Sequence, residues 1–127
     1  MFGSPLIGTP IAQASGGAGS FTPALPAGAS EGMLSIGFFN SDEHDSAWGA
    51  APANWNSISG FPTSGSGTIE FAANIIYRIL PAVPSDPTVA YTESATNDSI
   101  TCQMVCIPGD FSGAVTDSDV IDIVGTL

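Results

Sequence analysis

Glycine and proline interrupt this chain so often that no long helix is compatible with it. The sequence holds 15 Gly and 10 Pro, and turn signals recur roughly every 8 to 15 residues. Apart from residues 68–80, no stretch free of such breakers keeps apolar residues at the helical spacing i, i+3, i+4, i+7. The pattern therefore predicts an all-β fold whose short strands form an antiparallel β-sandwich.

Short runs of β-branched and apolar residues lie between the turns and predict the strands. These runs are Ile7–Ala14, Ser20–Pro23, Met33–Phe39, Trp55–Ser57, Thr68–Leu80, Thr88–Tyr91, Ser99–Ile107 and Val120–Val124. The stretch TIEFAANIIYRIL also fits a helical stripe, but it lacks N-cap chemistry, which favours a strand. Read as a strand, it places Phe71, Ala73, Ile75, Tyr77 and Ile79 on one face and Glu70, Ala72, Asn74, Ile76 and Arg78 on the other.

The N-terminal segment differs in character from the rest. A length of 127 residues suits one domain with a single core, and we assign residues 20–127 to the sandwich. Residues 1–19 are small, uncharged and rich in Gly, Ser and Pro. Two interpretations fit them: an extended arm that lies on another protein, or an edge strand followed by a Gly-rich loop.

The charge balance restricts the classes of partner. The chain has no Lys, Arg78 is its only strong cation, and its net charge is −11. Such a surface repels phosphate backbones and anionic lipids, so nucleic acid and membranes are not expected partners. If Arg78 is buried, it should pair with an acid or with backbone carbonyls, and a subunit contact is the alternative. No cationic secretory leader is visible, so assembly in a cytoplasm is expected.

The two cysteines are expected to be buried thiols. Cys102 and Cys106 share one face of a predicted strand about 13 Å apart, too far for a disulfide. With only one His, far along the chain, they also lack the spacing of a zinc site.

Six turn and strand motifs follow one another along the chain, and their order says more about the protein family than any one motif does. They are Pro26-Ala27-Gly28 with Gly32-Met33-Leu34, Pro52-Ala53-Asn54-Trp55, Tyr77-Arg78, Asp86-Pro87-Thr88-Val89-Ala90-Tyr91, Cys106-Ile107-Pro108-Gly109 and Val120-Ile121-Asp122. Over roughly residues 20 to 124, this order resembles a family of β-rich structural domains common in tailed bacteriophages. The chain departs from that pattern at Asn54, where Gly is usual, and at Met33, where Asp is common.

The resemblance implies a jelly-roll-like sandwich in a virion, without catalysis or cofactor. It implies a decoration protein of the head or a component of the tail or fibre, with the major capsid protein or another virion protein as partner. Relatives often continue beyond the last motif, so either the present version is compact or a neighbouring chain completes the sheet by strand addition.

The acidic stretch NSDEHDSAW, residues 40–48, admits two interpretations. Asp42, Glu43 and Asp45 offer oxygen ligands for calcium. The spacing lacks the D-x-D-x-D-G pattern and a distal Glu, however, which favours a solvated loop. His44 has no recognisable nucleophile in its setting, and no pair of carboxylates stands out, so the chain is not expected to be an enzyme.

The aromatic residues raise a second function, carbohydrate binding by an adhesin-like module. Trp48 and Trp55 with Phe38, Phe39 and Phe61 could form a platform for sugar rings. The favoured interpretation places Trp55 and the Phe residues in the core and leaves only Trp48 as a surface candidate.

The sequence thus predicts a non-enzymatic capsid decoration protein that binds and stabilises an assembled shell. It is expected to associate with further copies of itself, because weak contacts add in a lattice. The residues expected to make protein contacts are Phe2, Leu6, Ile7, Ile11, Arg78 and Trp48.

Overall fold

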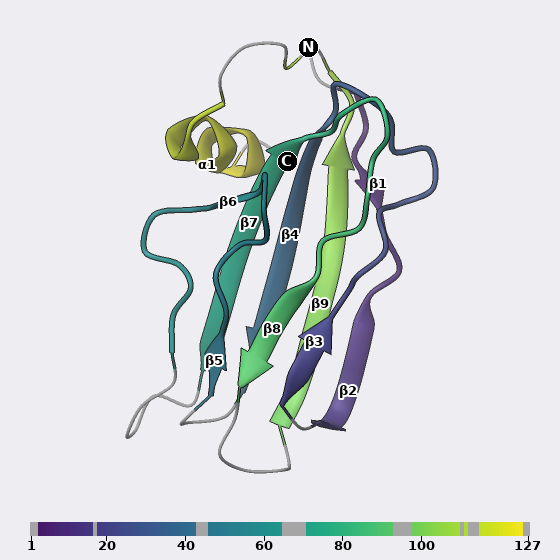
Figure 1. Ribbon diagram of the computed structural model, residues 1–127. Coiled ribbons are helices and arrows are strands. Elements are labelled where there is room, and N and C mark those ends of the chain that lie inside the picture. Colours follow the sequence, from purple (N-terminus) through teal and green to yellow (C-terminus); the bar gives the residue numbers. More distant parts are fainter. Residues whose placement is uncertain are drawn as a thin grey trace.

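Two antiparallel sheets pack face to face in the computed structural model (Figure 1). The structure describes residues 3–16, 18–42, 46–64, 71–92, 98–109, 111 and 115–125. The large sheet has the order β1-β9-β4-β7-β6, and β2 also pairs with β9; the small sheet has the order β3-β8-β5. The antiparallel β-sandwich predicted from the sequence is confirmed.

The strands of the large sheet are β1 (Leu6–Ile7), β2 (Ile11–Gly16), β4 (Leu34–Ser41), β6 (Asn56–Ser57), β7 (Ala72–Ile79) and β9 (Asp98–Ile107). Those of the small sheet are β3 (Gly19–Phe21), β5 (Ala47–Trp48) and β8 (Val89–Thr92). One helix, α1 (Asp117–Gly125), follows the last strand. Seven of the predicted strand regions contain a strand of the structure, and β5 was not predicted.

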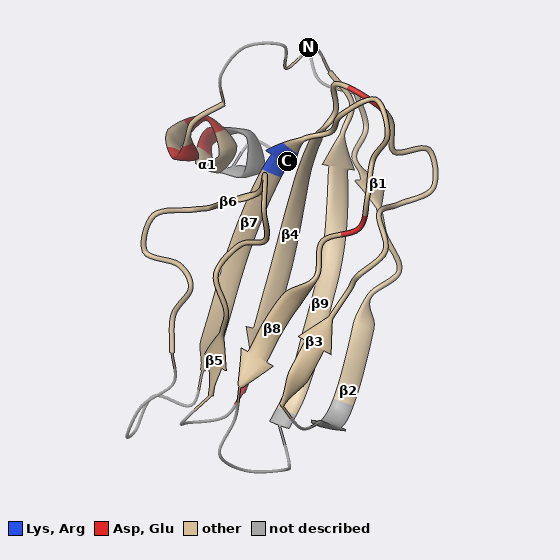
Figure 2. Ribbon diagram, in the orientation of Figure 1, with Lys and Arg blue, Asp and Glu red and all other residues tan. Residues whose placement is uncertain are grey.

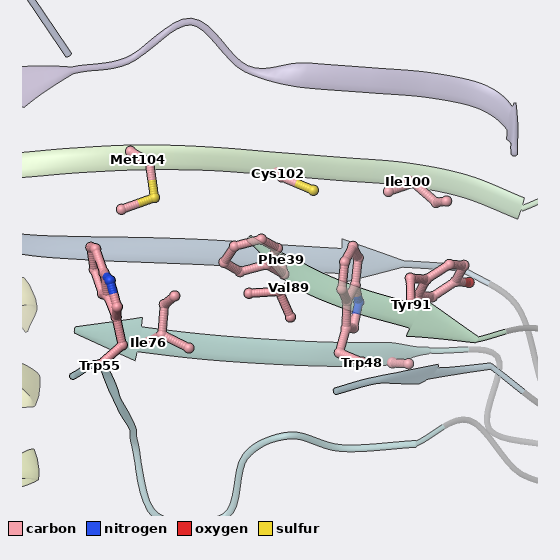
Figure 3. Close-up of a cluster of buried hydrophobic side chains, with 10 residues drawn as sticks. Phe39, Trp48, Trp55, Ile76, Val89, Tyr91, Ile100, Cys102 and Met104 are labelled. Carbon is pink, nitrogen blue, oxygen red and sulfur yellow. The ribbon is translucent and has the colours of Figure 1, made fainter. Parts of the chain in front are cut away.

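The central strand β4 pairs along its whole length with β7 and β9. Its side chains alternate between two apolar layers because successive residues of a strand point to opposite faces. Phe39 points into the space between the sheets, where the inter-sheet core lies (Figure 3). This core consists of Phe39, Trp48, Trp55, Ala72, Ile76, Val89, Tyr91, Ile100, Cys102 and Met104.

The opposite face of the large sheet carries a second apolar layer, which we call the outer core. Leu34, Ile36, Ile58, Tyr77, Ile107, Phe111 and Val120 form it. Val120 comes from α1, so the helix covers part of the sheet face that the small sheet does not cover. The face of β7 that is richer in large apolar residues, with Ile75, Tyr77 and Ile79, therefore points away from the small sheet.

The inward face of β7 carries one fully buried polar side chain, Asn74. Its Nδ2 donates to the carbonyl of Gly49 at 2.8 Å, and its Oδ1 accepts from the hydroxyl of Ser57 at 3.3 Å. A buried amide costs free energy unless its groups are paired. Here it joins β7 to β6 and to the segment that follows β5.

The predicted turns adopt the backbone conformations that their residues favour. Gly28, Gly32 and Asn54 have φ of 88°, 81° and 67°. The turn containing Asn54 is closed by the N–H of Trp55, which donates to the carbonyl of Pro52 at 3.0 Å. Asparagine tolerates this left-handed region better than most residues, so Asn54 can replace the usual Gly.

The prediction of a strand at Val120–Val124 is wrong, because these residues lie in α1. Thr116 caps the helix: its N–H and hydroxyl donate to Asp119 at 2.8 and 2.7 Å, and the N–H of Asp119 returns to the Thr116 hydroxyl at 3.4 Å. Asp117 and Asp119 also stabilise the helix, because their negative charges lie in its first turn, near the positive end of the helix dipole. The sequence contains a signal for the start of this helix, the pattern Thr-x-x-Asp at Thr116 and Asp119, directly before an apolar run.

Candidate interaction surface

One lateral side of the sandwich is built from uncharged sequence. No charged side chain occurs before Glu31, so the absence of charge extends to Ser30. Strands β1, β2 and β3 all come from this segment, and they form an edge of the large sheet and an edge of the small sheet. In Figure 2, β1, β3 and the coloured part of β2 carry neither acidic nor basic residues. We call the described residues 3–21 the neutral side.

The residues of β1 and β2 divide between the core and solvent. Ile11 packs partly buried against the inter-sheet core. Leu6 is half-buried, whereas Ile7 is 67% exposed. Ile7 is paired with Val105 of β9, so it extends the outer face of the large sheet toward its edge. Phe2 lies outside the described residues.

Arg78 lies half-buried near the end of β7, paired with Ser35 of β4. Figure 2 shows this position as the basic segment at the upper end of β7, away from β1 and β2. A subunit contact made by Arg78 would therefore use a different part of the surface from the neutral side.

Carboxylates beside the strands serve as acceptors for backbone N–H groups. Oδ1 of Asp42 accepts from the N–H of Ser99 at 2.8 Å, and Oδ1 of Asp86 accepts from the N–H of Leu25 at 2.8 Å. With one Arg in the chain, few acids can form ion pairs, whereas backbone donors are abundant. These two carboxylates therefore connect segments far apart in the sequence.

Of the three residues considered as calcium ligands, the structure describes only Asp42. Glu43 and Asp45 lie outside the described residues, as does His44, so the choice between a calcium site and a solvated loop is not tested there. Among the residues that the structure does describe, no group of three or more His, Cys, Asp or Glu side chains gathers in a way that could hold a metal.

A third carboxylate, Asp117, fastens α1 to the sandwich. Its Oδ1 accepts from the hydroxyl of Tyr77 at 2.8 Å, and its Oδ2 accepts from the N–H of Ser59 at 2.6 Å. Burial, the hydrogen bond to Asp117 and the charges of Asp117 and Asp119 raise the pKa of Tyr77 to about 12. The hydrogen bonds to Thr116 lower the pKa of Asp119. The sequence reasoning did not identify this contact.

The cysteines are buried and free, as predicted. Both lie on the inward face of β9. Burial raises the pKa of Cys102 to about 12 and also raises that of Cys106. The thiolate is the reactive form of cysteine, so these thiols are poor nucleophiles and suit a packing role.

The tryptophans lie in the core and do not form a sugar platform. Trp48 is 3% exposed and Trp55 is 8% exposed, so the expectation that Trp48 lies on the surface is wrong. The Trp48 ring centroid lies 4.6 Å from that of Tyr91 and 5.2 Å from that of Phe39 (Figure 3). The ring centroid of Phe21 lies 5.7 Å from it. Its indole N–H has no hydrogen-bond partner among the residues that the structure describes. As a buried side chain, Trp48 is not available for the protein contact assigned to it.

The free energy of unfolding is expected to fall as the pH rises from about 9 to about 12. Cys102 and Tyr77 have raised pKa values in the folded protein, and the unfolded chain releases these protons first, from about pH 9 and 10. These two groups therefore contribute their full stabilisation below about pH 9, and this stabilisation is lost as the pH rises to about 12. Urea titrations at several pH values would measure the decline, and Cys102→Ala with Tyr77→Phe should reduce its slope. An equally steep decline in this double variant would contradict the assignment.

None of the described helices has the length and apolar character needed to cross a membrane. The comparisons with known proteins give no match: no family model, no curated protein and no solved structure is significantly similar to the chain. The resemblance to phage structural domains therefore stays a prediction from the sequence.

Proposed function

We propose that this chain is a non-enzymatic virion structural protein that decorates and stabilises an assembled phage shell. The observation that carries the proposal is the segregation of charge: all 12 acids follow residue 30, whereas the strands of the neutral side carry none. In a protein of net charge −11, an uncharged side can approach another protein surface with little electrostatic repulsion. The major capsid protein is the proposed partner.

The order of turn and strand motifs supplies the second argument, since it suggests a virion protein. A ligand that binds only the assembled shell stabilises it by mass action, and many copies make weak contacts effective. The carbohydrate-binding alternative has no such support, because Trp48, Trp55 and Phe39 of its expected aromatic platform are buried.

Shell binding can be tested by co-sedimentation of the purified protein with assembled heads that lack it. Ile7→Asp places a carboxylate on an exposed position of the neutral side, and it is expected to reduce occupancy at least tenfold, because it puts an unpaired charge into the contact and removes apolar contact. Ile121→Asp is the matched control: Ile121 is 56% exposed on α1. Wild-type protein that fails to sediment with the heads, or equal loss from both variants, would contradict the proposal.

Point substitutions are preferable to removing residues 3–19. That segment contains β1 and β2, which pair with β9, and Ile11 packs against the core. Its deletion would expose β9 and part of the core, so a loss of binding would not separate docking from folding.

A further inference from the structure

The strand β2 presents an open edge of the large sheet. It has 6 residues, whereas the other edge strands have three (β3) or two (β1, β5 and β6). Within the described parts of the chain, β2 pairs with β9 and with no other strand. An edge strand carries a row of backbone N–H and C=O groups that can pair with another strand.

The hydrogen bonds of β9 show which of its backbone groups face this edge. The N–H of Gly8 donates to the carbonyl of Met104 at 2.8 Å, so the backbone groups of Met104 point toward the edge. Backbone groups of successive residues alternate in direction in an antiparallel ladder, so even-numbered residues of β9 face β1 and β2. The N–H of Ser99, an odd-numbered residue, donates to Asp42 just after β4, in agreement with this assignment.

The register then fixes the orientation of β2. Ile11 is opposite Cys102 and Gln13 is opposite Ile100, so these two residues of β2 turn their backbone groups toward β9. Ala12, between them, must turn its N–H and C=O away from the sheet, and its side chain is exposed. The edge therefore offers a donor and an acceptor at Ala12.

The first half of this edge, Ile11 to Gln13, lacks the features that usually prevent pairing. Natural edge strands are protected by charged side chains, by proline, by bulges or by a covering segment. The residues from Ile11 to Gly16 include no charged side chain and no proline, and both Ala12 and Gln13 are exposed. The register shift between Gln13 and Gly16 confines regular pairing to the first half of the strand.

From these features we infer that β2 pairs antiparallel with β2 of a second copy, joining two large sheets across a two-fold axis beside Ala12. Ala12 and Ala12 of the partner subunit exchange both backbone hydrogen bonds, and Ile11 lies opposite the partner's Gln13. A second copy fits because its edge has the same free donor and acceptor and adds no charge to the contact. Two bodies of net charge −11 otherwise repel each other, so only a neutral edge allows close approach.

The charge makes the expected association dependent on salt. Added NaCl screens the long-range repulsion between the two bodies, whereas it leaves the uncharged pairing intact. The dimer should therefore become tighter as the salt concentration rises. Contacts that depend on opposite charges would weaken under the same conditions.

Sedimentation velocity of the isolated protein over a series of NaCl concentrations tests the inference. Wild-type protein is expected to form a dimer whose dissociation constant falls with salt. Ala12→Pro removes the outward N–H without removing a bond to β9, and it is expected to weaken the dimer at least tenfold. Ala12→Val keeps the N–H and should dimerise like the wild type. A wild-type protein that stays monomeric at every salt concentration, or a dimer that Ala12→Pro leaves intact, would overturn the inference.

Hydrogen exchange of the wild-type protein keeps the inference testable if Ala12→Pro does not fold. The amide of Ala12 should exchange slowly at high protein concentration and rapidly on dilution, whereas the amide of Gln13 should be protected at both. Fast exchange at Ala12 at all concentrations would contradict the pairing. The experiment uses no phage heads, so its result is independent of shell binding.

Discussion

Replacing Trp48 with alanine is expected to lower the free energy of unfolding by about 3–5 kcal/mol. The side chain is buried and packs against Phe21, Phe39 and Tyr91, so its removal leaves a large cavity between the two sheets. A single domain has a total stability of only about 5–15 kcal/mol, so the variant should be close to unfolding. Urea unfolding followed by far-UV circular dichroism would measure the change.

Two control variants make this experiment specific. Trp48→Phe should lower the free energy of unfolding clearly less than Trp48→Ala, because it keeps most of the ring packing and removes an indole N–H that has no partner in the described part of the chain. Phe71→Ala, at a position that is 49% exposed, should change the free energy by no more than about 0.5 kcal/mol. If Trp48→Ala were as mild as Phe71→Ala, Trp48 would not be a core residue.

Replacing Asp117 with alanine is expected to cost about 1.5–3 kcal/mol, because the carboxylate accepts hydrogen bonds from both Tyr77 and Ser59. Its loss leaves the hydroxyl of Tyr77 without its acceptor and loosens α1 from the outer core. In a Tyr77→Phe background the same substitution should cost less, since one of the two bonds is already absent. A double-mutant cycle from urea unfolding would measure this coupling.

The same contact has a spectroscopic signature. In Asp117→Asn, the pKa of Tyr77 should fall from about 12 toward its usual value, because the negative charge is gone. It should remain raised, since burial is the largest cause of the shift. Absorbance of the tyrosinate during an alkaline titration would record it. An unchanged pKa of Tyr77, together with additive free energies in the cycle, would show that Asp117 does not hold the helix.

The sequence predicted those backbone conformations that depend on only a few neighbouring residues. Gly28, Gly32 and Asn54 were predicted to form turns, and each adopts the positive φ that its residue type permits. Cys102 and Cys106 were predicted to share one buried face of a strand for the same reason, since side chains of a strand alternate regardless of context, and both are buried in β9.

The helix α1 could also have been predicted, because Thr116 and Asp119 form a capping pair that involves only residues close in sequence. The short apolar run that follows fits a strand equally well when only its composition is considered. What favours the helix is Val120, which packs from α1 into the outer core with residues of β4 and β7.

Sequence alone determined that this chain is an antiparallel β-sandwich with an uncharged N-terminal part and a strongly acidic remainder, because turn chemistry, alternation and charge are local properties. Only the tertiary structure decided that Trp48 is buried, since β5 is held against β8 by pairing with residues far along the chain. It also decided that Asp42, Asp86 and Asp117 accept backbone N–H groups, and that Ala12 faces outward from a sheet edge. These properties depend on which strands become neighbours, and pairing over such distances is not encoded in any short stretch of sequence.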